Sequence, residues 1–90
     1  MSYEFRWNEA NVDHIDGHNI VPAEAEYVVN HPFRGYPRAM EEEKYLAKGQ
    51  TANGHYIQVI YVFDPPGVVY VIHARPMTIR ERRALNRRRR

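Results

Sequence analysis

Residues 44–75 constrain the fold more than any other part of the chain, because their pattern predicts three successive β-strands. The middle strand is apolar at seven of its eight positions and rich in β-branched and aromatic side chains. Such a composition is typical of a strand that is covered on both faces, so this strand is expected at the centre of a sheet. The three strands are predicted at residues 44–50, 56–63 and 68–75.

Two short connections join these strands. Asn53-Gly54 accepts positive φ at little cost and favours a hairpin turn before the middle strand. After it, Pro65-Pro66 disfavours a plain type I turn, and a longer loop or a cis peptide bond before Pro66 is expected. The segment is therefore predicted to be an antiparallel meander.

Three helices are predicted from capping signals. Asn8 is a good N-cap, Pro22 is a good first helical residue, and Thr78 begins a capping box. The first helix is expected to stop where Gly17 or Asn19 adopts a left-handed conformation. These signals predict helices over residues 9–16, 22–30 and 79–86.

Residues 3–7 alternate aromatic and charged side chains, which predicts a short, half-buried edge strand. The whole pattern predicts one α+β domain over residues 1–90. Its two N-terminal helices would pack on a small antiparallel sheet, made of the meander and the edge strand, and a short C-terminal helix would follow. A domain this small buries little surface, so a homodimer or a hetero-oligomer with a partner is expected.

The third strand of the meander has two chemically different faces. The uncharged face, which is expected to pack on the helices, carries Val68, Tyr70, Ile72 and Ala74. The opposite face, which is expected to stay uncovered, carries Val69, Val71, His73 and Arg75. From the helices, the residues expected to face the sheet are Val12, Ile15, Ala25, Val28 and Val29.

The net charge of +2 conceals a polarised chain. Residues 75–90 hold eight arginines and one acid, whereas residues 1–74 hold five basic and ten acidic side chains. Because the arginine fork matches phosphate, the C-terminal cluster predicts contact with nucleic acid or with an acidic partner. The alternative is a solvated, frayed tail over residues 87–90. The candidate RNA-binding residues are Arg82, Arg83, Arg87 and Arg88.

Several classes of site are not expected. The chain has no cysteine, no signal-peptide pattern and no membrane-spanning stretch, which fits a cytoplasmic protein. His14 and His18 have a helical spacing that can bind a metal, and Glu41–Glu43 is acidic, but neither pattern completes a ligand set. We therefore expect no metal and no cofactor.

Three stretches, in this order along the chain, resemble the BrnT family of toxins, within the RelE-like superfamily of bacterial toxin–antitoxin systems. The resemblance implies a small α+β fold with two N-terminal helices on an antiparallel sheet. It also implies ribonuclease toxicity that a cognate antitoxin neutralises. The stretches are Phe5-Arg6-Trp7-Asn8-Glu9 with Asn11-Val12-Asp13-His14-Ile15 and His18, then Tyr45–Gly54, then Val71–Thr78 with Arg80-Glu81-Arg82-Arg83.

Metal-independent RNA cleavage requires groups that move protons and cations that stabilise the phosphate transition state. Histidine titrates near neutral pH and arginine binds phosphate through two bonds, so His73, Arg75 and Arg80 are the predicted catalytic set. His55 and Tyr61, on or next to the neighbouring strand, are further candidates.

Each prediction has a structural alternative. His73 would simply complete a sheet face, and Arg75 would form an ion pair with an acidic side chain such as Glu42 or Glu43. The strand aromatics are expected mainly in the core, with base stacking as the alternative. The alternative function is a non-catalytic RelE-like module that binds an antitoxin or nucleic acid.

Overall fold

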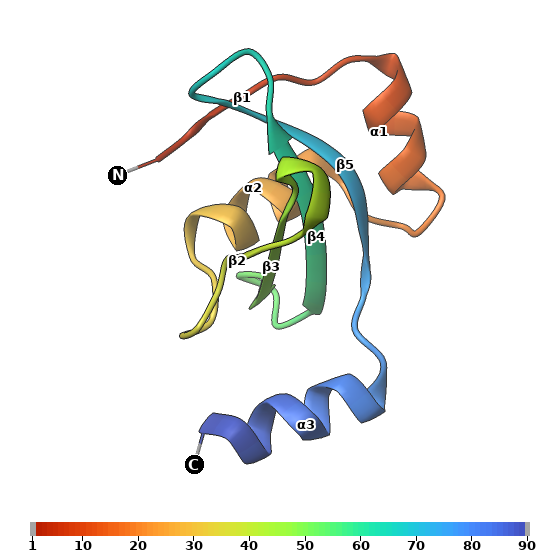
Figure 1. The fold of residues 1–90 in the computed structure, drawn as a ribbon. Coiled ribbons are helices and arrows are strands. Elements are labelled where there is room, and N and C mark those ends of the chain that lie inside the picture. Colours follow the sequence, from red (N-terminus) through yellow and green to blue (C-terminus); the bar gives the residue numbers. More distant parts are fainter. Residues whose placement is uncertain (1, 90) are drawn as a thin grey trace.

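The computed structural model describes residues 2–89, together with the side chains of residues 2–86. The fold is α+β, with a five-stranded mixed sheet in the order β1-β5-β4-β3-β2 (Figure 1). The elements in chain order are β1 (Glu4–Phe5), α1 (Glu9–Asp16), α2 (Pro22–Asn30), β2 (Arg38–Ala39), a 3-10 turn (Glu41–Glu43), β3 (Tyr45–Gln50), β4 (Tyr56–Phe63), β5 (Val68–Pro76) and α3 (Ile79–Arg89). Within residues 2–89, no helix is long and apolar enough to cross a membrane.

The meander forms as predicted, with β3, β4 and β5 in antiparallel register. The prediction of an all-antiparallel sheet was wrong, because β1 pairs with β5 in parallel. It also missed β2, whose two exposed residues pair with the start of β3 and lack any alternating pattern. The loop after β4 has its cis peptide bond before Pro65 rather than before Pro66.

The helix boundaries follow local capping chemistry. Asn8 Oδ1 accepts a hydrogen bond from the backbone N–H of Asn11, and the Asn11 side chain accepts one from the N–H of Asn8. Asn19, with φ of 61°, is the left-handed residue after α1, whereas Gly17 remains right-handed. At the start of α2, Glu24 Oε1 accepts from the N–H of Val21, which has no side-chain acceptor of its own.

A β-bulge in β5 means that the residues before it face the opposite way from the prediction. Tyr61 pairs with Val71 but Ile60 pairs with His73, so Ile72 has no partner on β4. The residues of β5 that are buried in the core are therefore Val69, Val71 and Ala74. The assignment of Val68, Tyr70 and Ile72 to the helix-covered face was wrong. After the bulge the prediction agrees with the register, so His73 and Arg75 alternate with the buried Ala74. His73 is not left uncovered as predicted, because its ring contacts His14 of α1.

The core lies between the two N-terminal helices and the sheet. Ile15 from α1 and Ala25, Val28 and Val29 from α2 are buried with the inner residues of β3, β4 and β5. Gly49 of β3 allows α2 to approach closely, because a Cβ there would lie 3.1 Å from Val28 Cγ1. Figure 1 shows α2 across one face of the sheet, α1 beside β5, and α3 at the end of the sheet where β5 stops.

Candidate functional site

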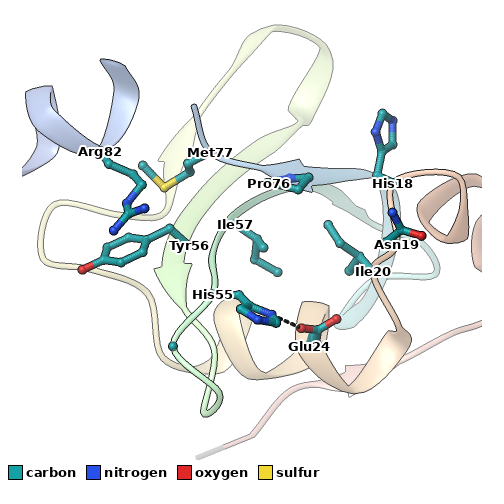
Figure 2. A pocket seen from close by; sticks show the side chains of 11 residues that line it. His18, Asn19, Ile20, Glu24, His55, Tyr56, Ile57, Pro76, Met77 and Arg82 are labelled. Atoms are coloured by element: carbon teal, nitrogen blue, oxygen red, sulfur yellow. Dashed lines mark hydrogen bonds and ion pairs between the residues drawn. The ribbon is translucent and has the colours of Figure 1, made fainter. Parts of the chain in front are cut away.

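One pocket of about 400 Å³ lies where three parts of the chain meet, and we call it the junction pocket. The α1–α2 turn, the start of β4 and the β5–α3 connection form its walls, and its floor is apolar (Figure 2). Concave sites with an apolar floor and a few polar groups are the usual form of binding sites. The lining residues are His18, Asn19, Ile20, Glu24, Gly54, His55, Tyr56, Ile57, Pro76, Met77 and Arg82.

A histidine–carboxylate pair stands on one side of the junction pocket. His55 Nδ1 lies 3.2 Å from Glu24 Oε2, and the other carboxylate oxygen of Glu24 is fixed by the backbone of Val21. The Glu24 side chain is largely buried, whereas that of His55 is 67% exposed. Because the carboxylate orients the ring through Nδ1, Nε2 of His55 remains available to exchange a proton with a ligand.

The positively charged side chain of Arg82 lies on another side of the junction pocket. The guanidinium carbon of Arg82 lies 4.2 Å from the centre of the Tyr56 ring, which is a cation–π contact. Arg82 belongs to the first turns of α3, where its N–H donates to the carbonyl of Thr78. The capping box that starts α3 therefore sets the position of this positive charge.

Three histidines meet beside the junction pocket, and we call them the histidine cluster: His14, His18 and His73. Nε2 of His14 lies 3.1 Å from Nδ1 of His73, and the three ring centres are separated by 5.4, 5.4 and 6.4 Å. His18 belongs to both the cluster and the pocket. Among the described residues, no group of three metal-binding side chains is arranged to hold a metal ion.

Burial lowers the pKa of His73 from its ordinary value of 6.5, and the positive charges of His14, His18 and Arg75 lower it further. Unfolding releases His73 from this environment, so the unfolded chain binds the proton more readily than the folded chain. The free energy of unfolding is then fully retained above about pH 6.5 and falls as the pH drops below it, towards the folded pKa.

We therefore expect wild type to lose more stability between about pH 7.5 and about pH 5.5 than a His73→Asn variant. Urea unfolding at the two pH values measures the difference. His31→Asn is the control, since His31 stacks on Tyr27 and lies outside the cluster. Equal losses in wild type and His73→Asn would mean that folding does not disfavour the charged form of His73.

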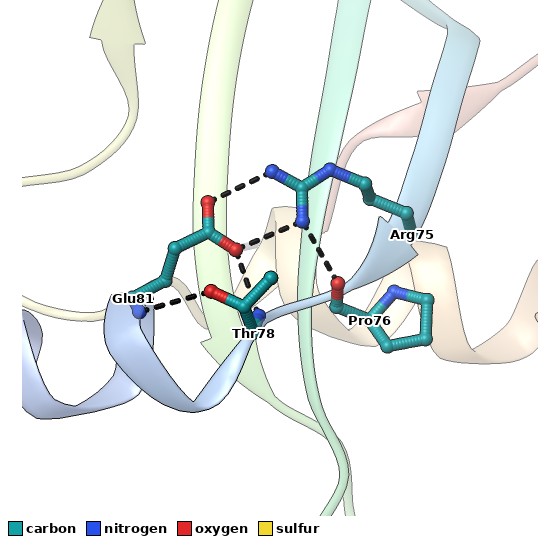
Figure 3. Close-up of polar contacts among 4 residues, drawn as sticks. All are labelled: Arg75, Pro76, Thr78 and Glu81. Atoms are coloured by element: carbon teal, nitrogen blue, oxygen red, sulfur yellow. Dashed lines mark hydrogen bonds and ion pairs between the residues drawn. The ribbon is translucent and has the colours of Figure 1, made fainter.

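Arg75 is held in an ion pair with Glu81. Its two terminal nitrogens each donate to one oxygen of Glu81 at 2.8 Å, and Nη1 also donates to the carbonyl of Pro76 (Figure 3). Glu81 in turn accepts from the N–H of Thr78, which caps α3. The partner is thus Glu81, rather than Glu42 or Glu43, and the pair fixes α3 to the end of β5.

The remaining predicted catalytic residues do not gather around Arg75. Tyr61 is 1% exposed, and burial first, then Tyr3 and Tyr45, raise its pKa to about 12, so it is a core residue. Arg80 and Arg83 are exposed on α3, and within the described residues Arg80 makes no hydrogen bond or ion pair with His73 or Arg75. The side chains of Arg87 and Arg88 lie outside the described residues.

The catalytic role of His73, Arg75 and Arg80 stays a prediction, and the junction pocket brings together a different group of residues. His55 and Arg82 were predicted candidates, and the fold brings them to the junction pocket with His18 and Glu24. Sequence reasoning missed the last two as site residues. Glu24 carries the ordinary signal of a first-turn acid, and it lies 31 positions from His55, so no spacing connects the pair.

Comparison with known proteins gave no match: no family model, no curated protein and no solved structure is similar to this chain at a significant level.

Proposed function

We propose that this protein is a metal-independent endoribonuclease, the toxin of a bacterial toxin–antitoxin pair, acting in the cytoplasm with the junction pocket as its active site. The observation that carries the proposal is the convergence of an oriented histidine, a second histidine and an arginine on one cavity. The sequence resemblance to BrnT toxins supports the same activity. A cognate antitoxin and dimer contacts belong to the proposal as its protein partners.

In this proposal His55 acts as the general base, with Glu24 as the group that positions it. His55 Nε2 takes the proton of an RNA 2′-hydroxyl, whose oxygen attacks the adjacent phosphorus. The bond to the 5′-oxygen breaks, His18 donates the proton that this oxygen needs, and the products are a 2′,3′-cyclic phosphate and a 5′-hydroxyl. Arg82 stabilises the charge that develops on the phosphate oxygens.

One observation favours the alternative of a non-catalytic binding module. Arg75, a residue within the motif that carries the resemblance, is occupied by Glu81. A binding module needs only a fixed scaffold, which this ion pair supplies.

Incubating the purified protein with RNA in the presence of a chelator tests the proposal. The expected products end in a 2′,3′-cyclic phosphate and begin with a 5′-hydroxyl, and induced expression in bacteria is expected to stop growth. A His18→Gln, His55→Gln double variant is the matched control for both assays. Intact RNA together with equal growth of both strains would sink the catalytic proposal and leave the binding module.

A further inference from the structure

Aromatic rings continue from the wall of the junction pocket towards β2, and cationic side chains lie over two of them. Besides Arg82 over Tyr56, the guanidinium carbon of Arg38 lies 4.5 Å from the centre of the Tyr36 ring. Lys48 Nζ lies 5.8 Å from the same ring. Such cation–π contacts hold a ring and a charge in a defined mutual orientation.

Phe33 connects these two sites. Its ring centre lies 5.8 Å from that of Tyr56, and its N–H donates to the carbonyl of Lys48. The N–H of Tyr36 donates to the carbonyl of Phe33, so the loop is fixed to β3 at this point. We call Phe33, Tyr36 and Tyr56 the aromatic platform. All three are partly exposed, so each keeps accessible surface while its position is set by packing.

This combination matches the chemistry of single-stranded nucleic acid. Unpaired bases stack on aromatic rings, and the backbone phosphates between them bind cations. Three cationic side chains lie at the platform: Arg38, Lys48 and Arg82. Arg38 and Lys48 are two of only five basic residues among residues 1–74, which hold ten acidic residues. A duplex keeps its bases stacked on each other and cannot offer them to such rings.

We propose that the aromatic platform binds unpaired nucleobases of single-stranded RNA and so places an adjacent phosphate in the junction pocket. Tyr56 and Arg82 line the pocket as well as the platform, which makes the two sites continuous. The role of the pocket rests on the proposed function, whereas base stacking on the platform is testable by binding alone.

Fluorescence anisotropy with a labelled RNA of about ten unpaired nucleotides measures this binding. The His18→Gln, His55→Gln background prevents cleavage during the measurement. In that background we expect Tyr36→Ala and Tyr56→Ala each to raise Kd by about 5- to 150-fold. Tyr36→Phe keeps the ring and is expected to retain affinity.

Tyr27→Ala is the matched control. Tyr27 is also a partly exposed tyrosine, and its ring stacks on His31, the residue that follows α2. It is expected to leave Kd unchanged. The same RNA annealed into a duplex, or made abasic, is expected to bind at least about tenfold more weakly, in line with the loss of base stacking.

Three results would overturn the inference: equal affinity for the duplex, equal affinity for the abasic strand, or an unchanged Kd in folded Tyr36→Ala and Tyr56→Ala proteins. Circular dichroism establishes that each variant is folded. If RNA binds as expected but the wild type does not cleave it, the platform stands and the ribonuclease proposal fails.

Discussion

Replacing His55 with glutamine is expected to lower the rate of RNA cleavage about 10²–10⁴-fold, the usual contribution of a general base. Glutamine keeps the approximate size and polarity of the side chain but cannot accept and return a proton. The loss should appear in kcat rather than in RNA affinity, because His55 is assigned to the proton transfer and not to binding. Single-turnover cleavage of a labelled RNA measures the chemical step directly.

His31→Gln is the matched control for that experiment. Like His55, His31 is exposed and fixed through Nδ1, which lies 3.0 Å from the carbonyl of Tyr27, but it does not line the junction pocket. Its replacement is expected to leave the cleavage rate unchanged. A His55→Gln enzyme as fast as wild type would mean that another group removes the proton.

Glu24→Gln separates positioning from chemistry. The amide still offers an oxygen to the His55 ring, but it lacks the negative charge that strengthens the hydrogen bond from the ring. The cleavage rate is therefore expected to fall, but by less than in His55→Gln, because the group that accepts the proton is still present. A cleavage rate equal to that of wild type would remove Glu24 from the proposed site.

The parts of the fold that depend on local chemistry were predictable from the sequence. The boundaries of α1, α2 and β4 agree with the predicted ones, because caps, proline positions and runs of β-branched residues act over a few neighbouring residues. The parallel pairing of β1 and the short β2 depend on which edge of the sheet the chain reaches, and no local pattern encodes that.

The bulge at Ile72 explains why the predicted core face of β5 was wrong in the first part of the strand. Strict alternation along β5 assigned Val68, Tyr70 and Ile72 to the core instead of Val69 and Val71, and only the extra residue restores agreement at Ala74. The contacts of the histidine cluster also join distant positions. His14 and His73 are 59 positions apart, so neither spacing nor composition signals their contact.

Arg75 has a structural partner that the sequence motif did not reveal. In the sequence, an arginine at a strand end near other arginines is typical of a phosphate site. In the fold it is the partner of Glu81, only six positions away, and this pair joins the end of β5 to the first turn of α3. The position of Arg82 in the junction pocket therefore depends on Arg75 without requiring Arg75 to touch RNA.

Glu81→Gln is accordingly expected to lower the free energy of unfolding by about 2 kcal/mol, because it removes one partner of a charge-assisted pair and weakens the cap of α3. Hydrogen bonding to Arg75 is the main cause that lowers the pKa of Glu81 from 4.5 to about 2. That shift corresponds to roughly 3 kcal/mol at most, and partial solvent exposure of both side chains reduces it to about 2 kcal/mol.

The pH dependence of stability distinguishes this pair from a mere helix cap. Because the folded pKa of Glu81 is depressed, its contribution is present above pH 4.5 and is lost as the pH falls from 4.5 towards about 2. Urea unfolding across this range should show a steeper loss in wild type than in Glu81→Gln. The exposed Glu41, changed to glutamine, is the control and should leave both stability and its pH dependence unaltered. If Glu81→Gln were as stable as wild type at neutral pH, the ion pair with Arg75 would not stabilise the fold. Arg75 would then be a candidate for contact with phosphate.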